Sequence, residues 1–277
     1  MHIGVFSYYY LPVVNGVTVT IADWKRVGEK AGNRFTICIP SMGKGTEKNS
    51  EILEYPAVPL YKRFGITVPM FPESFVEKEF RARHIDVLHA HHPFYIGNLA
   101  LFLKKKLGIP LVFTYHTRYE DYFTSYFPWL SGQVLSDIVT AMVVRFMNRC
   151  DAVTVANEAL KQELFRKGVR TPVFLLPPGI DTDMFANGNR VVARNRMGLT
   201  PNDTVLLYVG RLAKEKDSYF LMRAFTHIHA KMPDVKLVLA GNGLEEERLK
   251  KYTQKQKCGK QIIFATRETI RTIPDIY

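Results

Sequence analysis

Residues 109–122 read IPLVFTYHTRYEDY, and this stretch sets the organisation predicted for the rest of the chain. Its first half is a short apolar run, the pattern of a strand buried on both faces of a parallel sheet. The run stops at His116, and hydroxyl, guanidinium, carboxylate and phenol groups follow it. In an open α/β sheet, ligands bind just beyond the carboxyl ends of the strands. We therefore predict that the segment after this strand forms one edge of an active site.

Short apolar runs and amphipathic stretches alternate on both sides of this segment. Expected strands lie at 2–7, 34–40, 85–92, 152–155 and 173–176, and expected helices at 18–30, 75–83, 95–106, 135–149 and 158–167. This order is typical of βαβ units that build a parallel sheet. The sequence therefore predicts a doubly wound α/β domain.

The run Pro177-Pro178-Gly179 interrupts this pattern, which then restarts. Further strands are expected at 205–209, 235–240 and 261–265, with helices at 219–231 and 244–256. We therefore expect two domains, residues 1–178 and residues 179–277. The elements after the break make only about half of a doubly wound domain, so we expect the second domain to be truncated.

The chain of 277 residues carries 38 Lys and Arg against 26 Asp and Glu, a net charge of +12. This excess favours an anionic partner: nucleic acid, an anionic membrane or phosphorylated small molecules. Each basic cluster taken singly is also typical of a solvated helix face. The three cysteines show no metal-binding spacing and indicate a reducing compartment. No apolar run has the length of a membrane span and no targeting signal precedes the first strand, so we expect a soluble or peripheral protein.

Two loops that follow expected strands carry groups suited to a diphosphate. Gly16 precedes the first helix, where backbone N–H groups can bind phosphate, although a simple turn explains this glycine equally well. In the segment GRLAKEK, residues 210–216, Arg211 offers a fork of donors and Lys216 a point charge. The alternative is a basic surface loop. The sequence has no GxGxxG fingerprint, which argues against a dinucleotide-dependent oxidoreductase.

Two motifs raise the question of a metal. His89 and His91 lie on one face of an expected strand, but no third ligand follows at a suitable spacing. Asp181-Thr182-Asp183 imitates a metal-binding DxD motif, yet it follows the break between the domains rather than a nucleotide-binding strand. A turn and a helix cap explain this motif better. We therefore expect no metal site.

Together, several segments resemble the retaining glycosyltransferases of family four, which have the GT-B fold of two Rossmann-like domains facing a cleft. The segments that carry the resemblance are GVFSYYYLPVVNGV, LHAHHPF, FTYHTRYEDY, LLPPGIDTDMF, YVGRLAKEKD and LVLAGNG. They cover essentially the whole chain in the family's order. The variant TYHTxYEDY is most similar to diacylglycerol glucosyltransferases, which make glucolipids at the membrane surface from UDP-glucose.

This resemblance implies a retaining hexosyltransferase whose donor is a UDP-sugar and which needs no metal or other cofactor. Gly16, Arg211 and Lys216 are similar to the family's groups that bind the donor diphosphate. His116 is similar to the histidine beside the donor sugar. Bond breaking loads negative charge on the departing diphosphate, so side-chain cations and helix N-termini would stabilise it.

Other parts of the resemblance concern the acceptor and the end of the chain. Glu120 or Asp121 would orient the histidine or the acceptor hydroxyl, and the leaving phosphate would take the acceptor proton. The family's EX7E motif, which holds the donor ribose and sugar, falls beyond residue 277. The segment FATR, residues 264–267, stands where the family usually has a glycine. We therefore expect an incomplete donor site and no transferase activity from this chain alone.

Aromatic residues gather beside the central strand and point to the acceptor. Tyr119, Tyr122, Tyr126 and Trp129 precede the amphipathic helix expected at 135–149. Aromatic rings beside basic residues suit the interface of an anionic bilayer; the alternative is that the rings fill the core. We expect a lipid-type acceptor such as diacylglycerol, and a cytoplasmic protein held peripherally at the inner face of the membrane.

Three alternatives to this function stay open. In the first alternative, the chain is a glycosyltransferase whose acceptor is a polysaccharide or a lipid-linked glycan. In the second, it is a non-catalytic membrane-binding fragment. A nucleic-acid binder would also explain the charge, but the sequence carries no RNA-binding or helix-turn-helix signature. We therefore expect no nucleic-acid partner.

Overall fold

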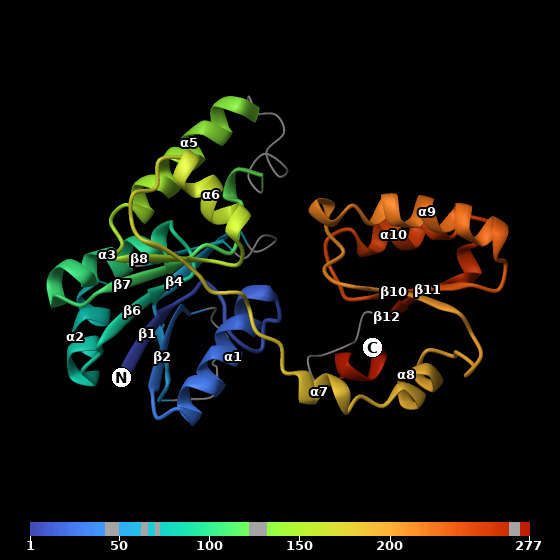
Figure 1. The fold of residues 1–277 in the computed structure, drawn as a ribbon, viewed down its shortest axis with the longest axis horizontal. Coiled ribbons are helices and arrows are strands. Elements are labelled where there is room, and N and C mark those ends of the chain that lie inside the picture. The colour runs from blue at the N-terminus through green and yellow to red at the C-terminus, as the bar shows by residue number, and fades with distance from the viewer. Residues whose placement is uncertain (42–49, 62–65, 70–72, 122–131, 266–271) are drawn as a thin grey trace. The chain divides into compact units, whose positions relative to one another are not determined.

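The computed structural model describes residues 1–41, 50–61, 66–69, 73–121, 132–265 and 272–277 (Figure 1). The chain forms two compact units, Met1–Ile180 and Asp181–Tyr277, here called unit 1 and unit 2. The boundary predicted from the sequence lies between residues 178 and 179. Each unit has its own parallel sheet and its own hydrophobic clusters.

Unit 1 is built on a sheet of seven parallel strands. In spatial order they are β3 (Ile52–Tyr55), β2 (Arg34–Pro40), β1 (His2–Phe6), β6 (Val87–Ala90), β7 (Leu111–Thr114), β8 (Ala152–Val155) and β9 (Val173–Leu175). A separate antiparallel pair consists of β4 (Ala57–Tyr61) and β5 (Ile66–Pro69). Near-continuous apolar runs, such as RFTICIP in β2, suit strands that are covered on both faces.

Helices cover both faces of this sheet (Figure 1). They are α1 (Gly16–Lys30), α2 (Glu73–Arg83), α3 (Tyr95–Leu107), α5 (Gly132–Met147) and α6 (Glu158–Arg166). Successive strand residues point to opposite faces, so Val5 and Phe6 of β1 enter different clusters. Val5 packs with Ile21 of α1. Phe6 belongs to the larger cluster that α2, α3, α5 and α6 also contribute to.

The strand order of unit 1 reverses direction between β1 and β6. Such a switch point leaves a crevice at the carboxyl ends of the two strands, because their connections run to opposite sides. The chain leaves β1 at Ser7, β6 at His91 and the neighbouring β7 at Tyr115. The loops that carry the histidines and Gly16 therefore share one edge of the sheet.

The structure changes several limits predicted from the sequence. α1 begins at Gly16 rather than at residue 18, because the Asn15 side chain accepts hydrogen bonds from the N–H groups of Val17 and Thr18. The Thr18 hydroxyl accepts from the Asn15 N–H in return and completes a capping box. The strand expected at 85–92 is confined to β6. The sequence pattern did not assign β3, β4 or β5.

The described residues of unit 2 form three parallel strands in the order β10 (Val205–Val209), β11 (Lys236–Ala240) and β12 (Ile262–Ala265). Its helices are α7 (Thr182–Ala186), α8 (Arg190–Arg196), α9 (Ser218–Lys231) and α10 (Glu246–Thr253), with the 3₁₀ turns η1 (Lys214–Lys216), η2 (Gly259–Gln261) and η3 (Ile273–Ile276). Alternate residues of β11 enter two clusters, Leu237 and Leu239 on one face and Val238 on the other.

The last described residues of unit 2 return to the segment that opens it. The N–H of Asn189 donates to Asp275 Oδ1 at 2.8 Å, and the rings of Phe185 and Tyr277 meet edge-on with centroids 5.3 Å apart. A Cβ at Gly188 would lie 2.1 Å from the carbonyl oxygen of Pro274, so only glycine permits this approach. Helices α7 and α8 are therefore anchored by η3. The sequence analysis expected a helix cap at Asp181 but gave no bounds for α7 and did not predict α8.

In the described part of the chain, no helix combines the length and the apolar character that crossing a bilayer requires.

Candidate active site

A stack of imidazole rings occupies the switch-point edge of unit 1. His91 follows β6 directly and His116 lies just beyond β7. Nδ1 of His91 is 2.8 Å from Nε2 of His116, and the two rings stack with centroids 5.0 Å apart. The ring of His89 lies 4.4 Å from that of His91. Trp24 of α1 stacks on His89 at 5.3 Å and closes the stack from the helix side. The segment TYHTRYED and the segment HAHH, separate in the sequence, thus meet.

Hydroxyl groups and a tyrosine fix the rings around this stack. Nε2 of His89 lies 2.7 Å from the Thr114 hydroxyl, which lies 2.7 Å from the hydroxyl of Thr154 on β8. The ring of His92 meets that of Tyr8 with centroids 4.9 Å apart, and the Tyr8 N–H donates to its Nδ1 at 3.4 Å. Groups from β1, β6, β7 and β8 are therefore tied into one arrangement.

Burial makes these histidines poor bases. Loss of solvent lowers the pKa of His89 and of His92 to about 3 and that of His116 to about 4. It also holds the pKa of His91 well below its usual range. All four rings are therefore neutral at pH 7, each with one N–H donor and one acceptor nitrogen. His116 is consequently suited to hydrogen bonding and not to acting as a cationic acid.

We expect this histidine stack to make unit 1 sensitive to mild acid. The pKa values in the folded state lie below the unfolded value near 6.5, so above pH 6.5 neither state takes up protons. Below pH 6.5 these histidines bind protons in the unfolded chain but stay unprotonated in the folded stack. Between pH 7 and pH 5 each ring should therefore lower the free energy of unfolding by on the order of 1–2 kcal/mol.

Thermal unfolding at pH 7, 6 and 5 measures this effect. The midpoint should fall as the pH falls, and His89→Gln, which keeps a polar group for Thr114, should show a shallower decline. An unfolding midpoint that is constant from pH 7 to pH 5 would contradict the neutral, desolvated state of the stack.

Glu120 and Asp121, which the resemblance placed beside the histidine or the acceptor, make other contacts. The buried carboxylate of Glu120 pairs with Lys167 at the end of α6 and accepts from the Tyr115 hydroxyl at 3.4 Å. Asp121 is exposed and lies 3.6 Å from the guanidinium of Arg118. The ring nitrogen Nε2 of His116 forms its hydrogen bond with Nδ1 of His91 instead.

Tyr119 does not face a membrane or an acceptor in this structure. Its side chain is 6% exposed and meets the Phe94 ring edge-on with centroids 5.1 Å apart. The prediction failed for this residue because its ring closes the core cluster beneath the histidines, the alternative that the sequence left open. Tyr122, Tyr126 and Trp129, which the sequence also assigned to the acceptor side, lie outside the described residues.

Gly16 occupies the first position of α1, at the same edge of the sheet. A Cβ added there would meet no atom within 4 Å, so the residue borders open space. Asn15 takes up the N–H groups of Val17 and Thr18, while the N–H of Gly16 has no acceptor among the described residues. One backbone donor at the positive end of the helix dipole is thus available to an anion.

In unit 2, the loop after β11 holds the loop after β10. The N–H of Leu212 donates to the carbonyl of Asn242 at 2.9 Å, and the N–H of Glu245 donates to the carbonyl of Leu212 at 3.0 Å. A Cβ at Gly241, where φ is +139°, would lie 2.1 Å from the carbonyl oxygen of Gly210. The segment AGNG therefore permits backbone-to-backbone packing, which fixes the residues on either side of Arg211.

The sequence did not reveal this supporting role of AGNG, which entered only as part of the family resemblance. A usable signal was present, because two glycines directly after a strand often mark a close approach of another backbone segment.

Arg211 and Lys216 are exposed cations of this same loop region. The guanidinium of Arg211 donates to Glu215 at 2.7 Å, and Lys216 lies in the 3₁₀ turn η1 before α9. Among the described residues Lys216 has no ion-pair partner. Asp217 then caps α9 by accepting from the N–H of Phe220 at 3.1 Å. The loop thus presents two cations beside the start of a helix, a setting suited to phosphate.

The structure supports the turn-and-cap interpretation of the DTD motif. Asp181 caps α7 by accepting from the N–H of Met184 at 3.1 Å. In the part of the chain that the structure describes, no three His, Cys, Asp or Glu side chains are grouped so as to hold a metal ion.

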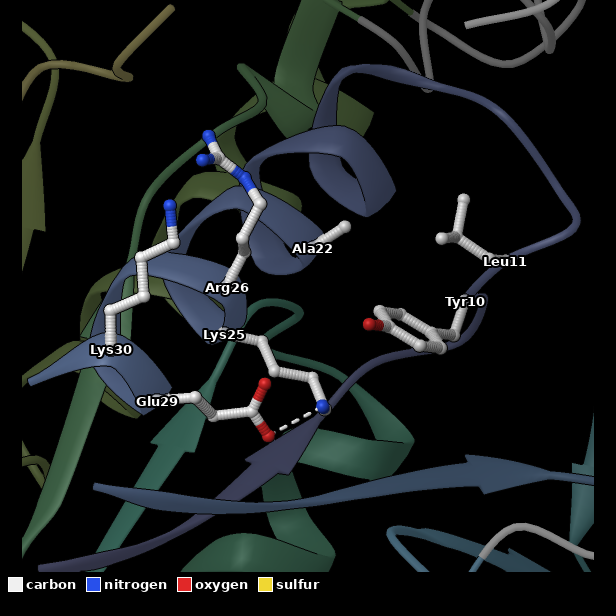
Figure 2. Close-up of a pocket in the computed structure, with 7 residues that line it drawn as sticks. All are labelled: Tyr10, Leu11, Ala22, Lys25, Arg26, Glu29 and Lys30. Carbon is white, nitrogen blue, oxygen red and sulfur yellow. Dashed lines mark hydrogen bonds and ion pairs between the residues drawn. The ribbon is translucent and has the colours of Figure 1, made fainter. Parts of the chain in front are cut away.

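A hollow of about 510 Å³ lies on another face of α1. Its lining residues are Tyr10, Leu11, Ala22, Lys25, Arg26, Glu29 and Lys30 (Figure 2). Figure 2 shows Lys25 turned toward Glu29, to which it donates at 2.6 Å. None of the lining residues belongs to the histidine stack, whose contact with α1 runs through Trp24. The lining of the hollow therefore does not include the histidine stack.

Comparisons with known proteins identify the family of the chain. The family model described as Glycosyltransferase Family 4 matches residues 14–184, and the one described as Glycosyl transferases group 1 matches residues 190–277. The chain is 26% identical to an alpha-monoglucosyldiacylglycerol synthase of Acholeplasma laidlawii, over 95% of this chain and 68% of that protein. It is 27% identical to the protein of the same name from Streptococcus pneumoniae, over 95% of this chain and 61% of that one. The chain thus spans about two thirds of the length of these relatives.

Solved structures share the fold at lower identity. A sucrose-phosphate synthase from Thermosynechococcus elongatus matches with a TM-score of 0.71 and 18% identity, over 100% of this chain and 72% of that one. Anabaena HepE in complex with UDP-glucose matches with a TM-score of 0.71 and 17% identity, over 99% of this chain and 71% of that one. These likenesses confirm the predicted GT-B fold class.

Proposed function

The chain belongs to glycosyltransferase family 4, and from this premise we propose that the complete protein transfers glucose from UDP-glucose to the hydroxyl of diacylglycerol, with retention at the anomeric carbon. The observation that carries the proposal is the likeness to two alpha-monoglucosyldiacylglycerol synthases over 95% of the chain. The chain is a hexosyltransferase by family; the sugar, the acceptor and the stereochemistry are the proposed part.

In the proposed reaction, Arg211 and Lys216 of unit 2 serve the departing diphosphate. A bond forms between the acceptor oxygen and the anomeric carbon while the bond from that carbon to the diphosphate oxygen breaks. The acceptor proton passes to the leaving phosphate, so negative charge on the diphosphate is greatest in the transition state. Arg211 and Lys216 would stabilise this charge as fixed donors. Within unit 1, the open space and available N–H at Gly16 suit a phosphate group, the role proposed for this residue.

His116 is proposed to contact the donor hexose. Its ring is neutral at neutral pH, so it can donate one hydrogen bond to a sugar hydroxyl without placing a positive charge beside the cationic ring of the transition state. A charged imidazolium at the same place would repel that developing positive character. The desolvated stack therefore suits a histidine that positions the sugar.

The lipid acceptor is supported by an apolar strip on α5. Val134, Ile138 and Met142 repeat at intervals of four residues and are 57%, 53% and 53% exposed. The opposite face of α5 packs in the core through Val139 and Val143. Arg145 continues the exposed strip one turn further, in the last turn of the helix. An apolar stripe that ends in a cation suits the surface of an anionic bilayer. We infer a peripheral enzyme at the cytoplasmic face of the membrane.

Glycosyl transfer tests the proposed function directly. The complete protein, supplied with labelled UDP-glucose and vesicles containing diacylglycerol, should produce a labelled lipid, and should do so in the presence of a metal chelator. GDP-mannose at the same concentration should give little product. Transfer of label only to a polysaccharide or to a lipid-linked glycan would overturn the acceptor, and strict metal dependence would overturn the metal-free donor site.

Vesicle sedimentation tests the α5 strip. We expect the protein to sediment with phosphatidylglycerol vesicles at low salt and to be released as salt rises, because each Lys or Arg near an anionic surface contributes about 1 kcal/mol. Ile138→Glu should weaken binding, since it places in the strip a negative charge, which the anionic vesicle surface repels. A matched control is Val192→Glu, at an exposed apolar position of α8 in unit 2. Equal binding to neutral and anionic vesicles, or equal loss in both variants, would contradict the proposed surface.

A further inference from the structure

The bond between His91 and His116 leaves one nitrogen of the buried ring without a partner. His91 is 1% exposed, and its Nε2 has no hydrogen-bond partner among the described residues. Its Nδ1 lies 2.8 Å from Nε2 of His116. Both rings are neutral at pH 7, so one ring donates and the other accepts. The position of the single proton on His91 therefore decides the tautomer of His116.

The hydrogen bond between His91 and His116 can form with either ring as the donor. Only one of these two arrangements leaves no buried N–H without an acceptor. If His116 donated from Nε2, His91 would carry its proton on Nε2, and that buried N–H would have no acceptor. If His91 donates from Nδ1, its Nε2 is an unprotonated nitrogen and no N–H is buried without a partner. Buried N–H groups without acceptors are rarer than buried acceptors without donors. The second arrangement is therefore favoured, and it places the proton of His116 on Nδ1.

Backbone hydrogen bonds and neighbouring rings hold His91 in place. Its backbone N–H donates to the carbonyl of Phe6 at 3.0 Å, and its own carbonyl accepts from the Tyr119 hydroxyl at 3.5 Å. Its ring lies between those of His89 and His116, and Trp24 lies against the stack with its centroid 5.7 Å from that of His91. A ring held in this way presents Nδ1 at a constant position.

We propose that His91 is a positioning residue: its Nδ1–H donates to Nε2 of His116 and holds that ring as the Nδ1–H tautomer. His116 then has its acceptor nitrogen occupied and offers one N–H, which has no acceptor among the described residues. The effect of this tautomer on glucosyl transfer rests on the proposed function, in which the free N–H of His116 donates to an oxygen of the donor hexose. The hydrogen-bond arrangement itself stands without any substrate.

Nuclear magnetic resonance of ¹⁵N-labelled histidines in the free protein tests the tautomer. The resonances of His116 are identified as those that are absent from the spectrum of His116→Ala. At pH 7 they should show a protonated Nδ1 and an unprotonated Nε2. His91→Asn can keep a donor near the place of Nδ1 and should preserve this pattern, while His91→Leu should leave His116 as a mixture of tautomers. His89→Gln, a change in the neighbouring ring that does not bond to His116, should leave the pattern intact. A protonated Nε2 on His116 in the unaltered protein would overturn the proposal.

Kinetics test the consequence for glucosyl transfer. His91→Leu should lower kcat by about 10-fold, on the scale known for groups that orient functional histidines, with KM for the donor nearly unchanged. His91→Asn should restore most of this loss. In a His116→Ala background, His91→Leu should have no further effect, because its action runs through that ring. Additive losses in the double variant would contradict a positioning role. Unchanged rates in His116→Ala would instead contradict the proposed contact between His116 and the sugar. The tautomer measured by magnetic resonance would not be affected by that result.

Discussion

We expect the replacement of Arg211 with alanine to lower the kcat of the complete protein by about 10²–10³-fold, the loss that follows when a donor aimed at transition-state charge is removed. The loop that carries this exposed guanidinium has its backbone held by AGNG, and the guanidinium itself donates to Glu215. Affinity for UDP should fall by a smaller factor, because a charged hydrogen bond in the ground state contributes about 1.5–3 kcal/mol. The larger loss in kcat than in affinity is the sign of a group that acts on the leaving diphosphate.

Steady-state kinetics and calorimetry with UDP measure these two quantities. Arg211→Lys retains the charge but loses the two-pronged donor, so it should fall between the native protein and Arg211→Ala. Arg223→Ala removes an exposed cation on α9 and serves as the matched control, with a rate close to the native one. A change of less than about threefold in kcat for Arg211→Ala would be too small for the transition-state role.

Replacing His116 with alanine should lower kcat by about 10²-fold, the scale on which misplacing a reacting group slows a reaction. Nucleotide affinity should stay close to native, because the ring is proposed to contact the sugar and not the phosphates. The pH profile of the native enzyme should show no ionisation of this histidine near neutrality, since burial lowers its pKa to about 4. Activity should therefore not decline on account of His116 until the pH approaches that value.

His227→Ala is the control for this variant, since His227 is an exposed histidine on α9. It should leave both kcat and UDP affinity unchanged. Equal rates for His116→Ala and the native protein would remove the stack from the chemistry. A large loss of UDP affinity in His116→Ala, with kcat preserved, would place the ring at the nucleotide and not at the sugar.

The edge of the sheet at His116 could be predicted from sequence because the relevant signals are local. The run before His116 shows a buried strand, and the polar groups after it show where the strand ends. The alternation with amphipathic stretches then indicates a parallel sheet, whose ligand edge is known. The same pattern placed His89 and His91 on one face of another expected strand but did not assign either of them to the candidate site. Fold class and the location of the candidate site followed from these patterns.

The partners of each side chain could not be predicted, because strand order and register are long-range properties. The bond between His91 and His116 depends on the pairing of β6 with β7, which places His89 opposite Val112. No local pattern specifies that pairing. For the same reason Glu120 was assigned to the histidine or the acceptor hydroxyl, whereas in the fold it pairs with Lys167, which follows α6.

The burial of individual aromatic side chains could not be predicted from the sequence either. Tyr119 belongs to a run of rings that suits either a membrane surface or a core, and composition does not distinguish the two. The structure places Tyr119 under His91 and leaves exposed apolar positions on α5 instead. The segment between them, residues 122–131, is outside the described part of the chain.

The anomeric configuration of the lipid product tests the central claim most directly. The complete protein would be incubated with UDP-glucose labelled at the anomeric carbon and with vesicles containing diacylglycerol, and the extracted glycolipid would be examined by nuclear magnetic resonance. The account predicts a glucosyl diacylglycerol whose sugar keeps the α configuration of the donor. A β-linked product, or a labelled product without diacylglycerol, would contradict it.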